Sequence, residues 1–216
     1  MSCFPVILSS PSGGGKTTIA RMLLTQRRDL GYSVSATTRH PREGEVDGVD
    51  YFFLTPDEFA GAVKRGDFAE WATVHGQKYG TLKREVERVL SSGKHVIMDI
   101  DVQGARLLSD AFANSVLIFL LPPSADVLVE RLRGRRSEGP EALVRRLETA
   151  VQELKAVSMY HYMVTNDRLD IAVARVSSII DAEAARRERR SPSAEVDVGA
   201  LITQLQLEIR KQQEKG

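Results

Sequence analysis

The stretch "SSPSGGGKTT" at residues 9–18 decides the fold of this chain. It follows the apolar run "FPVIL" and precedes "IARMLL", which predicts a buried strand, a glycine-rich loop and a helix from Lys16 to about Arg28. The stretch matches the phosphate-binding loop G-x-x-x-x-G-K-S/T except at Ser10, which stands in the place of the first glycine. It is either a phosphate cradle or a glycine-rich turn with an exposed lysine, and the flanking strand and helix favour the cradle.

The residue types in this loop suit the phosphates of a nucleotide. Glycines at 13–15 tolerate positive φ and let backbone N–H groups approach an anion, and the following helix points its positive dipole end at the same place. We expect Lys16 to contact the β- and γ-phosphates and the Thr17 hydroxyl to ligate Mg²⁺. The loop therefore predicts the donor side of a phosphoryl-transfer site.

The composition is that of a soluble globular protein. The chain has 216 residues, 42% apolar and 27% charged, with a formal net charge of +1, so no overall basic field indicates nucleic-acid binding. Cys3 is the only cysteine, which excludes an intrachain disulfide and fits a cytoplasmic location. The sequence contains no apolar run of about 18 residues and no secretory signal, so we expect no membrane association.

Beyond the loop, apolar strands alternate with helices. Strands are expected at "KHVIMDID" (94–101), "SVLIFLL" (115–121) and "YHYMVTN" (160–166), each followed by helical sequence. This order predicts a three-layer α/β core, a parallel sheet covered by helices on both faces. We assign residues 1–32, 85–123 and 156–185 to this core.

Residues 33–84 interrupt the alternation and predict an inserted α+β module. Short strands are expected at "YSVSATT" (32–38), "YFFL" (51–54) and "AEWATVHG" (69–76), and a helix over 81–93. Another helix should begin at a capping box formed by Thr55 and Glu58, with Pro56 at its first position.

The C-terminal residues 186–216 read as a linker followed by an amphipathic helix. The linker is "RRERRSPSAEVD" (186–197). Apolar residues then fall at helical spacing at Val198, Leu201, Ile202, Leu205 and Ile209. This stripe packs on its own core or pairs with another chain, so a monomer and a homodimer are both open.

Two acidic residues end the strand at 94–101. Asp99 and Asp101 are two residues apart and share one face of the strand. Because parallel sheets bind ligands at the carboxyl ends of their strands, this pair and the phosphate loop can share one crevice. For Asp101 a second interpretation is open, since it can instead cap the helix that follows.

Arginines are concentrated between residues 131 and 146. Arg131 and Arg135 are four apart and share a helix face, and "SEGPE" follows as a hinge. The segment is either a solvated basic surface or a lid that brings cations to a triphosphate, and the phosphate loop favours the lid. We assign residues 124–155 to this helical lid.

Six segments together resemble the guanylate kinase family. The resemblance runs from about residue 4 to about residue 182 and implies a P-loop kinase core, a GMP-binding module at 33–84 and a lid. It also implies transfer of the γ-phosphoryl of ATP to GMP, and to dGMP, with Mg²⁺. The segments are "SSPSGGGKTT", "SVSATTRHPREGEVDGVDYFF", "EWATVHGQKYGT", "MDIDVQG", "RLRGRR" and "VTND".

The resemblance also implies a role for each matching residue. Positions that hold the GMP phosphate are Arg39, Arg42, Tyr51 and Tyr79. Positions that read or flank guanine are Ser35, Glu70, Thr81 and Asp101. Positions that bind ATP are Ser12, Gly13, Gly14, Gly15, Lys16, Thr17, Thr18 and Asn166. The metal-side pair is Thr17 and Asp99, and the catalytic cations are Lys16, Arg39, Arg131, Arg135 and Arg146.

The chemistry of guanine agrees with these roles. Guanine presents N1–H and an amine as adjacent donors, which the carboxylate of Glu70 can accept together, while the hydroxyl of Ser35 can donate to O6. Adenine would leave that carboxylate unpaired, so such a site rejects the wrong base.

Two other functions remain as alternatives. Guanylate-kinase-like modules that bind phosphopeptides have lost catalysis, but they usually lack a working phosphate loop. Another small P-loop kinase could share the donor side, but Glu70 with Ser35 disfavours a different acceptor.

Overall fold

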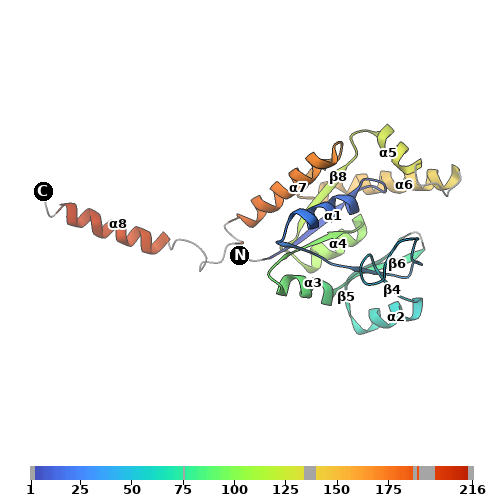
Figure 1. The fold of residues 1–216 in the computed structure, drawn as a ribbon, viewed down its shortest axis with the longest axis horizontal. Helices are drawn as coiled ribbons and strands as arrows, with labels where there is room; N and C mark the ends of the chain where they lie inside the picture. The colour runs from blue at the N-terminus through green and yellow to red at the C-terminus, as the bar shows by residue number, and fades with distance from the viewer. Residues whose placement is uncertain (1–2, 75, 134–139, 187–188, 190–197, 214–216) are drawn as a thin grey trace.

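Five parallel strands form the central sheet of the computed structural model (Figure 1), which describes residues 3–74, 76–133, 140–186, 189 and 198–213. The strand order is β2-β7-β1-β8-β9. The strands are β1 (Pro5–Ser9), β2 (Leu30–Tyr32), β7 (His95–Asp99), β8 (Val116–Leu121) and β9 (Tyr162–Thr165). Every pairing between them is parallel, which confirms the α/β prediction.

Helices cover both faces of this sheet, giving the three layers expected (Figure 1). On one face α1 (Lys16–Gln26) and α7 (Leu169–Ala184) bury Ile19, Leu23 and Val176. On the other, α3 (Lys83–Ser91), α4 (Val102–Ala111) and the 3₁₀ turn η1 (Ala156–Met159) complete a second core cluster. Burial of apolar side chains on both faces explains why the strands read as continuous apolar runs.

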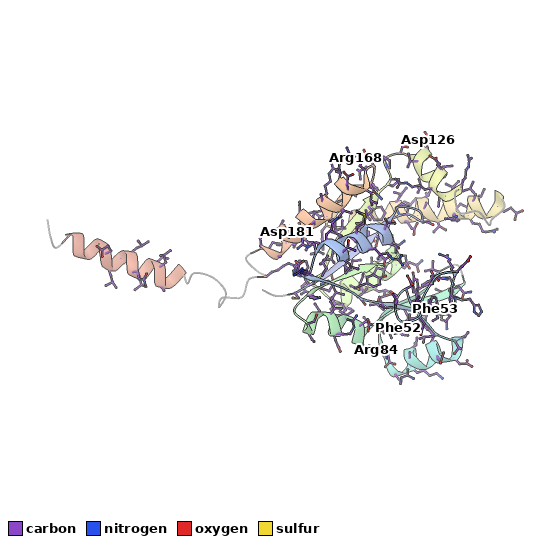
Figure 2. The ribbon with its side chains drawn as sticks, in the orientation of Figure 1. Phe52, Phe53, Arg84, Asp126, Arg168 and Asp181 are labelled. Atoms are coloured by element: carbon purple, nitrogen blue, oxygen red, sulfur yellow. The ribbon has the colours of Figure 1, made fainter. Side chains whose placement is uncertain are left out.

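A second sheet lies beside the core, in the part of the chain that the sequence marked as an insertion. Its order is β4-β3-β6-β5, with β4 (Phe52–Phe53), β3 (Ser35–Thr37), β6 (Gln77–Leu82) and β5 (Phe68–Val74). Helix α2 (Pro56–Arg65) covers it, and Phe59 of this helix stacks on Phe68 at 4.5 Å. Figure 2 shows Arg84, in the first turn of α3, beside Phe52 of β4; its guanidinium lies 5.1 Å from the ring.

The predicted capping box of α2 is confirmed. The hydroxyl of Thr55 accepts from the backbone of Glu58, whose carboxylate accepts from the backbone of Thr55. Both bonds satisfy backbone donors that the first helical turn leaves free.

Two local predictions are wrong in this region. The stretch 32–38 is not one strand: β2 ends at Tyr32 in the central sheet, and β3 begins at Ser35 in the second sheet. The helix predicted over 81–93 begins only at Lys83, because Thr81 belongs to β6. The sequence "QKYGTL" of β6 lacks an apolar run, so its pairing with β3 and β5 decides its conformation.

The expected lid contains two helices, α5 (Ala125–Arg133) and α6 (Pro140–Lys155). Leu128 and Leu132 of α5 pack with Ala150 of α6 in a separate small cluster. Residues 134–139, and with them Arg135 and the expected hinge, lie outside the described residues.

The predicted C-terminal helix is present as α8 (Val198–Gln213), and Figure 1 shows it projecting from the rest of the chain. Leu201, Ile202 and Leu205 are exposed on it. Most of the expected linker lies outside the described residues. None of the helices in the described ranges is long and apolar enough to span a membrane.

Candidate active site

The phosphate loop connects β1 to α1 in the conformation that its glycines allow. Gly13 and Gly15 have φ angles of 81° and 90°, in the left-handed region that side chains disfavour. The backbone N–H of Gly14 donates to the carbonyl of Pro11 at 2.8 Å, and α1 begins at Lys16. The helix N-terminus therefore faces the loop, as an anion site requires.

Ser10 fits the first loop position because Gly14 has no side chain. A Cβ at Gly14 would lie 2.5 Å from the Cβ of Ser10, which is too close for any larger residue. The buried hydroxyl of Ser10 donates to Pro11 at 2.9 Å. The departure from the loop pattern is thus accommodated inside the loop.

Asn166 holds the other side of the loop. Its side-chain amide donates to the carbonyl of Gly14 at 2.9 Å, and a Cβ at Gly15 would lie 2.5 Å from the amide nitrogen. The carbonyl of Asn166 accepts from Arg131 at 3.1 Å. This residue, expected near adenine, is buried and clamps the loop between β9 and α5.

The segment expected to form a lid reaches the loop through Arg146. One guanidinium nitrogen donates to the carbonyl of Leu132 at 3.0 Å, and the other donates to the hydroxyl of Ser12 at 3.3 Å. Two of the three predicted lid arginines are therefore oriented by groups of the core or of the lid itself. A guanidinium near the loop suits a phosphate, because its planar N–H groups match two phosphate oxygens.

Asp99 lies at the carboxyl end of β7, opposite the first turn of α1. The hydroxyl of Thr17 donates to one carboxylate oxygen, and the hydroxyl of Tyr32 donates to the other at 2.6 Å. Burial raises the pKa of Tyr32 far above its usual value, so it stays a neutral donor. A hydroxyl and a carboxylate beside a phosphate loop fit Mg²⁺, which takes oxygen ligands and completes its shell from phosphates and water.

Asp101 caps a helix, which was the second interpretation of this residue. One of its oxygens accepts from the backbone of Gln103 at 2.7 Å and of Gly104 at 3.0 Å, at the start of α4. The residue also lines the cleft, so capping does not remove it from the site.

Three polar side chains expected at guanine stand in one row across the second sheet, which we call the guanine row: Ser35, Thr81 and Glu70. Strand register pairs Ser35 with Thr81 and Thr81 with Glu70. The hydroxyl of Thr81 donates to Glu70 at 2.7 Å. Glu70 is only 8% exposed, and this burial raises the pKa of its carboxyl to about 7.

Gly104 makes room for the Glu70 carboxylate. A Cβ on this glycine would lie 3.1 Å from the nearer carboxylate oxygen. A side chain at this position would crowd the Glu70 carboxylate, so the glycine favours the close packing of helix α4 against β5 of the second sheet. The buried acid is thus enclosed between β5 of the second sheet and helix α4 of the core.

Arg39, one of the cations expected at the acceptor phosphate, pairs with Glu45, a carboxylate that the sequence analysis did not single out. Arg39 donates to both oxygens of Glu45, at 2.8 and 2.9 Å, and the backbone of Arg42 donates to it at 2.7 Å. The guanidinium of Arg39 lies 5.4 Å from the ring of Tyr51, which is 6.1 Å from that of Tyr79. The only indication in the sequence was that Glu45 is an acidic residue three positions after Arg42 in a charged loop.

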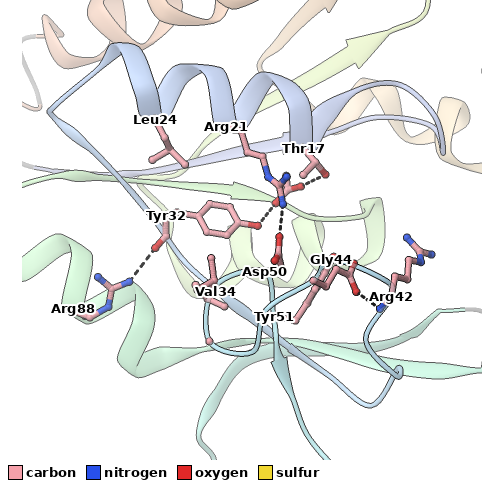
Figure 3. Close-up of a pocket in the computed structure, with 14 residues that line it drawn as sticks. Thr17, Arg21, Leu24, Tyr32, Val34, Arg42, Gly44, Asp50, Tyr51 and Arg88 are labelled. Carbon is pink, nitrogen blue, oxygen red and sulfur yellow. Dashed lines mark hydrogen bonds and ion pairs between the residues drawn. The ribbon is translucent and has the colours of Figure 1, made fainter.

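These groups meet in one cleft between the core and the second sheet. A cavity of about 240 Å³ is lined by Ser12, Gly13, Lys16, Thr17, Ser35, Arg39, Arg42, Tyr51, Glu70, Tyr79, Asp99, Asp101 and Glu153. It adjoins a larger cavity of about 790 Å³, in which Arg21 of α1 pairs with Asp50 (Figure 3). Gly14, Gly15, Thr18, Thr81, Arg131, Arg146 and Asn166 do not line either cavity.

Comparison with known proteins places the chain among relatives of one kind. A sequence model of the guanylate kinase family matches residues 2–183. A guanylate kinase of Clostridium perfringens is 47% identical over 85% of each chain, and one of Geobacter sulfurreducens is 46% identical over 85% of this chain and 90% of its own. The crystal structure of guanylate kinase from Anaplasma phagocytophilum aligns with a TM-score of 0.72 at 32% identity, covering 87% of this chain and 89% of its own.

Proposed function

The chain belongs to the guanylate kinase family, nucleoside monophosphate kinases that phosphorylate GMP with ATP, and on that premise we propose how its cleft does so. The observation that carries the proposal is the guanine row, whose buried acid faces the same cavity as Lys16 of the phosphate loop. We assign residues 33–84 to GMP binding, which we call the GMP module, and residues 124–155 to the lid.

The guanine row selects the base. Ionised Glu70 accepts from N1–H and the exocyclic amine, while Ser35 and Thr81 supply hydroxyls at its edge. The hydrogen bond from Thr81 already holds the carboxylate in place, so little ordering is needed when the base binds. None of these contacts involves the sugar, which supports dGMP as a second acceptor.

The acceptor phosphate binds where Glu45 now pairs with Arg39. A GMP phosphate can take the place of this carboxylate as the partner of Arg39 and accept from Arg42, Tyr51 and Tyr79. The aromatic contacts of Arg39 keep its guanidinium in the cleft during that exchange.

The donor triphosphate lies on the phosphate loop. Lys16 and the N–H groups of residues 13–16 contact its phosphates, and Arg131 and Arg146 approach from the lid. Thr17 and Asp99 would hold Mg²⁺, which neutralises charge on the β- and γ-phosphates when bound.

The reaction needs no strong general base, because the nucleophile is a phosphate oxygen of GMP that is already anionic near neutral pH. This oxygen attacks the γ-phosphorus, the bond to the β–γ bridging oxygen breaks, and ADP leaves with that electron pair. The protein contributes alignment and cationic groups between two polyanions, and closure of the cleft excludes water. Such a role in purine nucleotide metabolism fits a cytoplasmic location.

A coupled assay of ADP release tests the function. We expect release with GMP and dGMP, and only background release with AMP or without an acceptor. Equal rates with AMP would indicate another small kinase. Absence of GMP-dependent ADP release would favour the alternative of a phosphopeptide-binding module.

A further inference from the structure

Helix α6 contacts Ser12 of the phosphate loop at two points. The carboxylate of Glu153 accepts from the backbone N–H of Ser12 at 3.1 Å, and the guanidinium of Arg146 donates to its hydroxyl at 3.3 Å. Glu153 and Arg146 are seven residues apart, about two helical turns, and so share one face of α6. One loop residue is therefore held from its backbone and from its side chain by the same helix.

Glu153 is an unusual residue to find in this cleft. It lines the cavity with Lys16 and Asp101, where the triphosphate of ATP is proposed to bind. Its burial raises the pKa of the carboxyl, an effect opposed by its bond to Ser12 and by the charge of Lys16. A carboxylate repels phosphates, so a direct role in binding ATP is unfavourable, and its bond to the loop is the contact that explains its presence.

We propose that Glu153 is a positioning residue for phosphoryl transfer: its carboxylate oxygen holds Ser12 so that the loop and Arg146 are aligned for ATP. The proposal rests on the kinase function proposed above. The backbone N–H of Ser12 precedes the glycines whose N–H groups face the phosphates, so a shift at Ser12 moves that array. The same shift separates the Ser12 hydroxyl from Arg146.

This role requires a hydrogen-bond acceptor oxygen at the end of a side chain as long as glutamate. It does not require a negative charge. Glu153→Gln keeps an acceptor at the same reach. Glu153→Asp keeps the charge but is one methylene too short, and Glu153→Ala removes both. We therefore expect Gln to retain activity within about threefold, whereas Asp and Ala lose about tenfold or more in kcat/KM for ATP.

The test is steady-state kinetics of the full chain with each substrate varied in turn, beside binding of GMP by calorimetry. KM and Kd for GMP should stay within about twofold in all three variants, because the guanine row lies on the other sheet. Glu148, exposed on the same helix, supplies the control: Glu148→Gln, Glu148→Asp and Glu148→Ala should leave every constant unchanged.

A double-mutant cycle separates positioning from general damage. Glu153→Ala combined with Arg146→Ala should lose much less than the product of the single losses, because both act through Ser12. Loss of GMP binding would show that Glu153→Ala does not fold. In that case the comparison of Glu153→Gln with Glu153→Asp still tests the positioning role.

Three results would overturn the inference: full activity of Glu153→Ala, a Gln variant as impaired as Asp, or a loss that appears mainly in KM for GMP. All three presuppose an active wild-type chain. An inactive wild-type chain would instead refute the kinase function, so failure of that function can be told apart from failure of the Glu153 inference.

Discussion

The GMP module and the lid hold their charged side chains in different ways. In the GMP module, partners come from the same module: Thr81 donates to Glu70, and Glu45 pairs with Arg39. In the lid, Arg131 is oriented by the carbonyl of Asn166 in the core and Arg146 by Ser12 of the phosphate loop. The hydrogen-bond partners in the proposed acceptor site are thus local, whereas those in the proposed donor site come from separate parts of the chain.

This difference leads us to expect that the GMP module controls selectivity for the base, whereas the lid and loop control the turnover rate. A locally preorganised acceptor site can discriminate between bases whatever the state of the lid. Cations that are aligned by the core contribute only when lid and loop are correctly placed, so they act on turnover. Changes in the module should therefore alter the acceptor constants, and changes at the loop should alter kcat.

The largest expected effect is at the phosphate loop. Lys16→Ala should lower kcat by about a thousandfold, because the lysine neutralises charge at the transferred group, and should leave GMP affinity within about threefold. The measurements are ADP release and calorimetric GMP binding, with exposed Lys94→Ala as the matched control. A loss of GMP affinity equal to the loss in rate would remove the proposed separation of the two sites.

Next comes the buried acid of the module. Glu70→Gln should raise KM for GMP by about a hundredfold or more, since the amide presents a donor to a guanine donor. Saturating kcat should fall much less, and thermal stability above pH 7 should rise because an ionised buried carboxyl is removed. Exposed Glu87→Gln is the control, and equal losses in both variants would contradict the assignment.

The pH dependence of GMP binding follows from the same residue. The pKa of Glu70 is about 7 in the folded chain, raised from 4.5, so below pH 7 GMP binding requires loss of a proton. Affinity should fall by up to about tenfold for each pH unit below 7. The folded state also binds more protons than the unfolded state between pH 4.5 and 7, so this residue's contribution to stability falls as pH rises through that range.

Calorimetry from pH 5.5 to 8.5 measures this dependence. The GMP phosphate titrates near pH 6 as well, and the Glu70→Gln variant retains that second titration as a reference. If the variant and the wild type show the same slope, Glu70 is not the titrating group.

The smallest expected effect is at a contact between the GMP module and the core. Arg21 of α1 pairs with Asp50 of the GMP module, beside Tyr51, and the arginine side chain is 67% exposed (Figure 3). Because solvent screens the pair at its exposed arginine end, Arg21→Ala and Asp50→Asn should each weaken GMP binding only about twofold to fivefold. The double variant should lose no more than the single ones, and additive losses would show that the pair does not couple module to core.

Local sequence patterns determined the phosphate loop, the parallel core and the capping box of α2. Each depends on a short run of residues: glycines that permit positive φ, apolar strands buried on both faces, and Thr55 with Glu58. The strand β6 was missed because its polar sequence takes its conformation from pairing with β3 and β5.

Only the tertiary structure decided which partners the site residues have. Contacts such as Ser12 with Glu153, Asn166 with Gly14 and Arg21 with Asp50 join segments far apart in sequence. Residue type sets what a side chain can bind, but packing of separate elements sets what it meets and how far it is buried. The pKa of Glu70 shows this, because desolvation between β5 and helix α4, and no neighbour in the sequence, raises it.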